Sequence, residues 1–195
     1  LVIAPTTGSV GIGTIAPDKL LHLSSSEGTA VMRFSDTRTA MSTGDIGLIE
    51  FETFDTGSPG VGGYILGEAG GTGGQVDLAF AAGLGGSATE VMRIVSEGKV
   101  GIGTATPGSY WASADDLVIA TTGNTGMTLV AGTTSSSSAI AFADGTGSSA
   151  YRGRIEYNHS SDKLMLGAGG TTPFAIKGDG NTSLPDNSKA LFGTG

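Results

Sequence analysis

Two pairs of carboxylates are the residues of this sequence whose types and spacing come closest to those of a catalytic site. Glu50 and Glu52 alternate along an expected strand, so their Cα atoms would lie about 6.6 Å apart on one face. Asp115 and Asp116 form a second pair. Glycosidases hold two carboxyl groups about 5 to 9.5 Å apart around a sugar. A solvated strand face accounts for Glu50 and Glu52 equally well, so we expect no enzyme and assign no catalytic residue.

Two glycine-rich phrases, Gly11-Ile12-Gly13 and Gly101-Ile102-Gly103, raise the question of a nucleotide site. A dinucleotide fingerprint needs a third glycine and a following helix, and a phosphate-binding loop ends in Gly-Lys-Ser/Thr. Neither phrase has these features, so we expect no cofactor. The glycines instead allow backbones to approach closely where strands cross or bend. The apolar residues of the two phrases are expected to pack at junctions along the chain: Val10, Ile12, Val100 and Ile102.

The chain has two histidines, His22 and His159, in unlike sequence contexts, and it has no cysteine. A zinc site uses three or four ligands, so we expect no metal site within one chain. Three copies of one histidine meeting on a threefold axis are the one alternative. We expect His22 to be a strand residue and His159 to lie in a turn.

Tyr110 and Trp111 form the strongest aromatic pair of the sequence. Exposed aromatic rings stack on sugar faces, and Trp is enriched in recognition hot spots. These two residues are therefore candidate glycan contacts. The interpretation we favour is that they pack within an irregular loop.

The composition excludes several classes of partner. A net charge of −8 and an isoelectric point near 4.5 argue against nucleic acid, because phosphate binding needs clustered Lys and Arg. No window approaches the roughly 20 apolar residues that span a bilayer, so we expect no membrane insertion. With 35 Gly and only 14% charged residues, the chain can build only a thin core. We expect it to gain stability from neighbouring copies.

Short strand-like runs, separated by turns rich in Gly, Ser, Thr and Asp, predict an all-β fold. The expected strands are residues 20–23, 30–35, 47–53, 63–66, 75–81, 90–95, 116–120, 127–130, 139–143, 152–157, 163–166 and 174–177. The best helical candidate, Pro17–Leu23, spans only one to two turns. Alternation predicts that Ile155 and Tyr157 share one face of a hairpin, and that the hairpin returns along Lys163–Leu166.

The ten-residue segment Gly8–Pro17 recurs with similar sequence as Gly98–Pro107, and we call this segment the repeated phrase. Long internal repeats indicate modules stacked in a row. A similar sequence begins again at Gly180. The starts of the three copies are therefore 90 residues apart from Gly8 to Gly98 and 82 residues apart from Gly98 to Gly180. We predict a lead-in over residues 1–7, β modules over 8–97 and 98–179, and the start of a third module over 180–195 in a chain that continues.

The phrase Val10–Thr14, followed by Pro17 and Lys19–Leu23, resembles the "VGIGT…P…KLH" module of tail fibres and related virion appendages of tailed bacteriophages, especially marine ones. Residues 153–159 and 184–195 are similar to other recurring text of these fibres. The second copy departs from the pattern, because Gly108-Ser109-Tyr110-Trp111 takes the place of the KLH stretch.

This resemblance implies an elongated shaft of short-strand modules, intertwined as a homotrimeric β fibre on the virion and outside the cell. The implied partners are other copies of the chain, other tail or appendage proteins, and a host-surface glycan or receptor. Residues 58–62, 109–112 and 133–138 are the candidate host-contact loops. Similar phrases occur in bacterial surface proteins, so a trimeric adhesin on a bacterial cell is the alternative. A polysaccharide-degrading tailspike is a more distant one.

Overall fold

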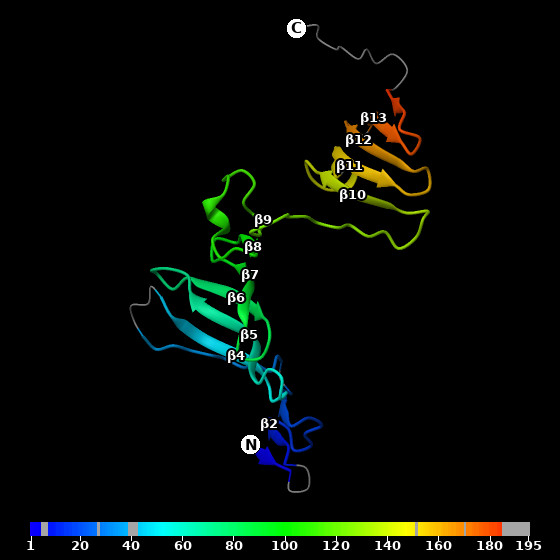
Figure 1. The fold of residues 1–195 in the computed structure, drawn as a ribbon. Coiled ribbons are helices and arrows are strands. Elements are labelled where there is room, and N and C mark those ends of the chain that lie inside the picture. Colours follow the sequence, from blue (N-terminus) through cyan, green and yellow to red (C-terminus); the bar gives the residue numbers. More distant parts are fainter. Residues whose placement is uncertain (5–7, 27, 39–42, 151, 170, 185–195) are drawn as a thin grey trace. The chain divides into compact units, whose positions relative to one another are not determined.

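The computed structural model describes residues 1–4, 8–26, 28–38, 43–150, 152–169 and 171–184. This part of the chain forms fourteen β-strands and two short 3₁₀ helices, η1 (Pro107–Ser109) and η2 (Gly147–Ser149), which confirms the all-β prediction (Figure 1). The chain divides into two compact units, residues 1–125 and 126–195. The predicted boundary between residues 97 and 98 follows the sequence repeat and falls inside the first unit. Residues 5–7 of the lead-in and 185–195 of the third module lie outside the described residues.

Sheet A has three short strands in the order β1-β2-β3. Their bounds are β1 (Val2–Ile3), β2 (Val10–Ile12) and β3 (Leu21–Leu23). β1 and β2 form an antiparallel hairpin, whereas β2 and β3 are parallel, with Val10 opposite Leu21. A parallel pair needs a crossover connection, and residues 13–20 supply it. The helical expectation for Pro17–Leu23 is therefore wrong, because this segment ends in β3.

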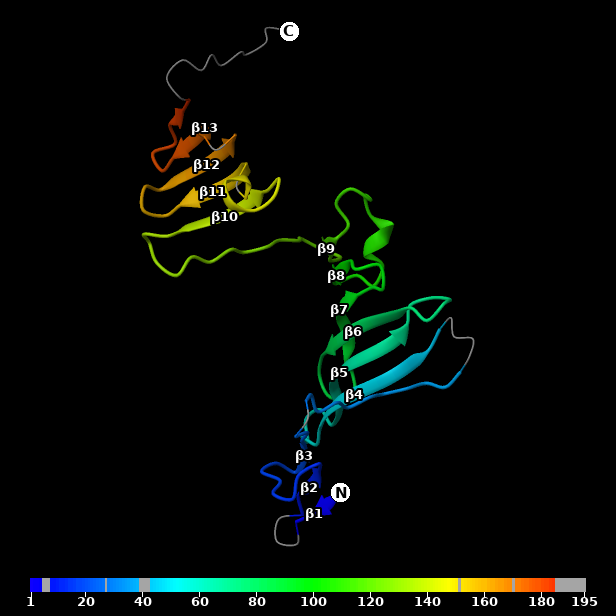
Figure 2. The same ribbon diagram turned by 180° about the vertical axis from the view of Figure 1, so that it is seen from behind.

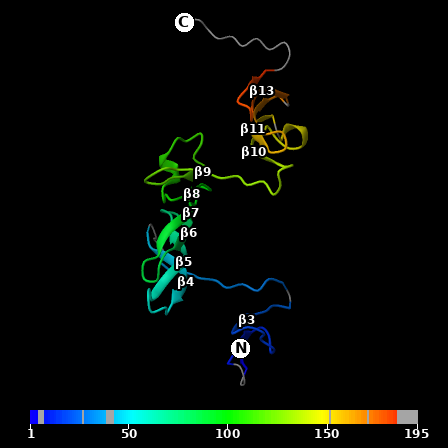
Figure 3. The same ribbon diagram turned by 45° about the vertical axis from the view of Figure 1, so that its right-hand side comes forward.

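Sheet B has six strands that follow one another in chain order (Figures 1 and 3). Their bounds are β4 (Asp45–Thr53), β5 (Gly60–Ala69), β6 (Val76–Ala82), β7 (Thr89–Ile94), β8 (Val100–Ile102) and β9 (Leu117–Ile119). All neighbouring pairs are antiparallel except β8 and β9, which are parallel with Val100 opposite Leu117. Residues 103–116 form the crossover between them.

Sheet C is an antiparallel meander of five strands (Figure 2). Their bounds are β10 (Ser137–Phe142), β11 (Gly153–Asn158), β12 (Lys163–Ala168), β13 (Thr171–Lys177) and β14 (Thr182–Ser183). The predicted hairpin is confirmed: Tyr157 lies opposite Leu164 and Asn158 opposite Lys163. Its turn places Asp162 at φ 50°, a left-handed conformation that Asp tolerates better than most residues.

Two of the expected strands, residues 30–35 and 127–130, are not strands in the single chain. Conversely, the repeated phrase itself forms strands, β2 and β8, where the sequence indicated only junctions. Local propensity describes how well a side chain fits a pleated, half-buried surface. A strand also needs a neighbour with which to exchange hydrogen bonds, and that neighbour is not encoded in a short segment.

The core of the chain is thin and built from small side chains. The buried apolar residues in the described part are Ala69, Ala79, Ala81, Val118 and Ala175, joined by the fully buried Pro107. Large apolar side chains of all three sheets are exposed, for example Ile12 at 48%, Ile49 at 43% and Ile155 at 42%. Many large apolar side chains of the described residues therefore remain in contact with solvent.

Candidate functional site

The two copies of the repeated phrase adopt the same local structure. Gly13 and Gly103 have φ of 79° and 73°, in the left-handed region. The Val10 N–H donates to the Leu20 carbonyl at 2.7 Å, and the Val100 N–H donates to the Asp116 carbonyl at 2.8 Å. These bonds join β2 to the chain entering β3 and β8 to the chain entering β9, in the same register.

This register identifies which residues of the second copy correspond to the KLH stretch of the first. Lys19–Leu23 leads into β3, and its structural counterpart is Asp115–Ile119, which leads into β9. The assignment of Gly108-Ser109-Tyr110-Trp111 to that place is therefore wrong. These residues belong instead to a crossover that is longer in the second copy than in the first.

The glycines of the phrase are required by close backbone approach. A Cβ on Gly101 would overlap the Thr104 carbonyl oxygen, and a Cβ on Gly103 would overlap the Ala120 carbonyl oxygen. Gly11 and Gly13 meet the equivalent carbonyls of the first copy. The chain therefore turns directly back over its own strand after each copy of the phrase.

The third occurrence of the phrase begins with the same turn. The Gly98 N–H donates to the Val95 carbonyl at 2.8 Å, and the Gly180 N–H donates to the Lys177 carbonyl at 2.9 Å. Both glycines have positive φ, 84° and 82°. Hairpin β13–β14 thus repeats the start of hairpin β7–β8, with Thr182 in the place of Val100.

Val100 and Ile102 lie on a continuous apolar face that crosses all six strands of sheet B. The paired register places its members side by side. The apolar face of sheet B consists of Ile49, Ile65, Val76, Leu78, Phe80, Met92, Ile94, Val100, Ile102, Leu117 and Ile119. None of these side chains is buried, and Ile102 is 40% exposed. Most large apolar side chains of sheet B therefore lie on this face, where they keep contact with solvent.

Val10 and Ile12 occupy the corresponding places in sheet A. They share one face with the neighbouring strand residues Ile3, Leu21 and Leu23 through the registers of β1, β2 and β3. Ile12 is 48% exposed. All four residues expected at junctions therefore project from uncovered apolar faces, two from each copy of the phrase.

Sheet C shows the same inversion of burial. Its apolar face consists of Ile140, Phe142, Ile155, Tyr157, Leu164, Leu166, Phe174 and Ile176. Along β11 and β12 the apolar residues of this face are exposed, whereas Arg154 and Glu156 on the opposite face are partly buried. Arg154 Nε donates to Glu156 at 2.7 Å. A folded monomer normally has the reverse arrangement, with its large apolar side chains inside.

The opposite face of sheet B holds a cluster of charges around Arg93, which is 13% exposed. Its guanidinium contacts Glu68 at 2.8 Å, Asp77 at 3.2 Å and Glu90 at 2.5 Å. These carboxylates, Glu90 first, raise the pKa of Arg93 above its usual value. Asp77 also accepts the Ser96 N–H at 2.9 Å. The cluster ties three strands together and was not foreseen from the sequence.

We expect Arg93→Met to lower the free energy of unfolding by about 3 kcal/mol, because three carboxylates would lose their shared cation in a partly buried place. Urea unfolding measures this change. The matched control is Arg38→Met, since Arg38 also has a 2.5 Å ion pair, with Asp36, but is exposed. Exposed ion pairs contribute little, so equal losses in the two variants would contradict a structural role for the cluster.

The carboxylates considered for catalysis lie in different surroundings. Asp115 is almost fully buried and bonded to Lys99 at 2.6 Å, so it anchors the long crossover to β8. Asp116 is exposed beside it. Glu50 and Glu52 are exposed on β4, as a solvated strand face requires.

The histidines have structural contacts. His22 lies in β3, as expected, with Nδ1 3.0 Å from Asp18. His159 follows β11, packs edge-on against Tyr157 with ring centroids 4.9 Å apart, and contacts Ser138 at 3.2 Å. Among the described residues, no group of three or more His, Cys, Asp and Glu side chains is placed to hold a metal ion.

Tyr110 and Trp111 project from the long crossover into solvent. Tyr110 is 49% exposed and Trp111 75% exposed, so the interpretation that they pack within the loop does not fit the single chain. The loop itself is well anchored, because Pro107 is fully buried and the Ala114 N–H donates to the Trp111 carbonyl at 2.8 Å.

Trp111→Ala is expected to change the free energy of unfolding by no more than about 0.5 kcal/mol, because the indole ring makes little contact with the chain. Thermal unfolding at fixed protein concentration tests this. A loss of several degrees would mean that another chain covers the ring.

Comparisons with known proteins do not assign this chain to a family. No protein-family model matches the sequence, and no curated protein matches it either. Among the described residues, no helix is long and apolar enough to span a membrane.

Proposed function

We propose that this chain is a structural segment of a fibre in which three copies associate through their apolar faces. The observation that carries the proposal is the inverted burial of the three sheets, which expose large apolar side chains and cover small or charged ones. Exposed apolar faces of this extent mark association surfaces. The role is mechanical: modules follow one another along the chain, and copies bind one another side by side.

The exposed apolar side chains favour association over a monomeric state. In the described residues, Ile12, Ile102 and Ile155 are 48%, 40% and 42% exposed on the apolar faces of the three sheets. A folded monomer normally buries such side chains, and a contiguous exposed apolar face marks an association surface.

The recurrence of the phrase supports stacked modules. Each occurrence places a left-handed glycine turn before a short strand, and the first two place a parallel strand after it. A unit that recurs with the same geometry can be added repeatedly along a shaft. The sequence resemblance to tail fibres favours a phage tail fibre or similar virion appendage, outside the cell and joined to other tail proteins.

A second candidate is a trimeric adhesin of a bacterial surface that binds glycans. The exposed Tyr110 and Trp111 on an anchored loop favour it. Binding to a glycan array that is lost in Trp111→Ala, while the assembly remains intact, would support this candidate. Binding unchanged by that substitution would remove these residues as the contact. The same loop could serve a host-recognition surface on a virion.

Light scattering coupled to size exclusion tests the proposal. A mass of three times 19.3 kDa is expected, and a compact monomer would overturn it. Electron micrographs of the native assembly then distinguish a virion appendage from a cell-surface fibre.

A further inference from the structure

One segment of strand-like sequence, residues 30–35, lies outside every sheet. Its residues are all exposed, including Val31, Met32 and Phe34. Within the described part of the chain, no backbone–backbone hydrogen bond joins it to another segment. Figure 3 shows the approach to β4 as a plain trace without an arrow. An apolar segment with free N–H and C=O groups tends to pair with another strand.

The segment precedes β4, a strand at the edge of sheet B, and residues 36–44 lie between the two. β4 is the outermost strand of sheet B and is nine residues long, so within the described residues one row of its backbone groups has no ladder partner. The second repeat has the same arrangement: residues 127–130 are exposed and precede β10, the outermost strand of sheet C. Ser138 Oγ of β10 donates to the Leu129 carbonyl at 3.1 Å.

The sequence of the segment is nearly that of an existing strand of the same sheet. Val31-Met32-Arg33-Phe34 matches Val91-Met92-Arg93-Ile94, which lies entirely within β7. In β7, Met92 and Ile94 lie on the apolar face and Arg93 on the charged face. A strand with this pattern therefore suits the alternation of sheet B.

The exposed edge of β4 complements the segment in charge and in the alternation of its side chains. β4 carries Glu50 and Glu52 and has no Lys or Arg, whereas the segment carries Arg33. None of these three has an ion pair in the described part of the chain. On the β4 edge, Arg33 would share a face with Glu50, and Met32 and Phe34 would extend the apolar face beside Ile49.

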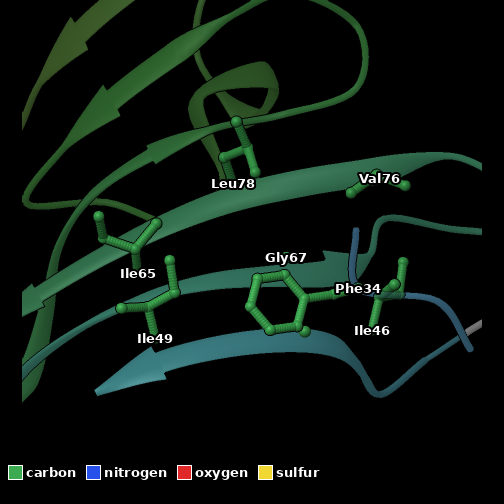
Figure 4. A pocket seen from close by; sticks show the side chains of 8 residues that line it. Phe34, Ile46, Ile49, Ile65, Gly67, Val76 and Leu78 are labelled. Atoms are coloured by element: carbon green, nitrogen blue, oxygen red, sulfur yellow. The ribbon is translucent and has the colours of Figure 1, made fainter. Parts of the chain in front are cut away.

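Phe34 already rests on that apolar face within its own chain. Its side chain occupies the space above Gly47 that a Cβ would fill. Together with Ile49, Ile65 and Leu78 it lines a groove of about 320 Å³ (Figure 4). Arg38, just beyond, donates to the Asp45 carbonyl at 3.4 Å. The segment is thus held over the face of its own sheet, and beyond the Arg38 bond the outer edge of β4 has no strand partner among the described residues.

We propose that residues 30–35 form a β-strand on the β4 edge of a neighbouring copy of this chain. The inference rests on the proposed self-association and specifies one of its contacts. Backbone bonds to the β4 edge add affinity, and the alternation of Met32, Arg33 and Phe34 sets the register. The exchange covers the β4 edge of sheet B and buries the exposed apolar side chains of residues 30–35.

Because the chain has no cysteine, engineered disulfides test the contact without background. A tagged chain with Arg33→Cys is co-expressed with an untagged chain carrying Leu48→Cys or Glu50→Cys, so that two registers are sampled. The control partner carries Ser87→Cys, an exposed residue between β6 and β7. After oxidation, disulfide-linked tagged–untagged dimers are expected at about tenfold the control yield, since a disulfide needs Cα atoms within about 7 Å.

Two results would overturn the strand exchange and leave the proposed function standing. One is an oligomer by light scattering whose cross-linking at residues 48 and 50 does not exceed the control. The other is a disulfide that forms only within a chain carrying both Arg33→Cys and Glu50→Cys, which would show closure on its own edge. A monomeric chain would refute both the exchange and the fibre.

Discussion

The doubly substituted chain Ile12→Asp/Ile102→Asp is expected to be a monomer at micromolar concentration. Both side chains project from uncovered apolar faces, with 48% and 40% of their surface exposed. Association would bury this exposed surface, and a carboxylate at either position would have to leave water without a hydrogen-bond partner. We expect the two changes to cost assembly at least about 3 kcal/mol per chain, a penalty that is multiplied in a symmetric trimer.

Light scattering and thermal unfolding measure this loss. The matched control is Ile15→Asp/Leu84→Asp, which makes the same charge change at apolar residues that are exposed but outside the sheets. We expect the control to assemble like the original chain. Far-ultraviolet circular dichroism should be similar for both, because Ile12 and Ile102 are not buried in the single chain. A trimer of unchanged thermal stability after Ile12→Asp/Ile102→Asp would refute their role.

The strands that could be predicted from the sequence are those whose partners lie next to them in the chain. The hairpin of Ile155, Tyr157 and Lys163–Leu166 was predicted with its turn and its faces, because a short turn fixes the register of two adjacent strands. Five of the six strands of sheet B, β4, β5, β6, β7 and β9, were also predicted, with bounds that differ by up to three residues, whereas β8 was not. Ile102 was expected only to pack at a junction, and the six-strand apolar face to which it belongs follows from the registers of sheet B.

What the sequence could not reveal depends on contacts between distant segments. The Arg93 cluster requires Glu68, Asp77 and Glu90 to meet across three strands. The register shift between β6 and β7 brings Glu90 opposite Ala81 on the same face as Arg93, and no local pattern encodes it. The KLH counterpart was misplaced because the two crossovers differ in length. Residues 30–35 were predicted as a strand from propensity, while their partner is absent from the single chain.

A series of Gly→Ala substitutions in the second copy of the phrase separates two costs in stability. These are the strain of an alanine with positive φ and the steric overlap of its Cβ with a backbone carbonyl, and Gly103 combines both. Gly98 has φ 84° and open space around its missing Cβ, so Gly98→Ala is expected to cost about 1 kcal/mol from left-handed strain alone. Gly101 lacks positive φ but faces the Thr104 carbonyl, so Gly101→Ala should cost about 2 kcal/mol from overlap.

Gly103→Ala should be the most damaging member of the series. Gly103 combines φ 73° with the Ala120 carbonyl in the space of its Cβ, so a loss of about 3 kcal/mol or more is expected. The Thr104 carbonyl at Gly101 and the Ala120 carbonyl at Gly103 both belong to the backbone, which cannot move aside as a flexible side chain would. Urea unfolding at fixed protein concentration ranks the three variants. Equal losses for Gly98→Ala and Gly103→Ala would mean that the chain does not fold back over β8, and that the phrase is not the rigid junction on which stacked modules depend.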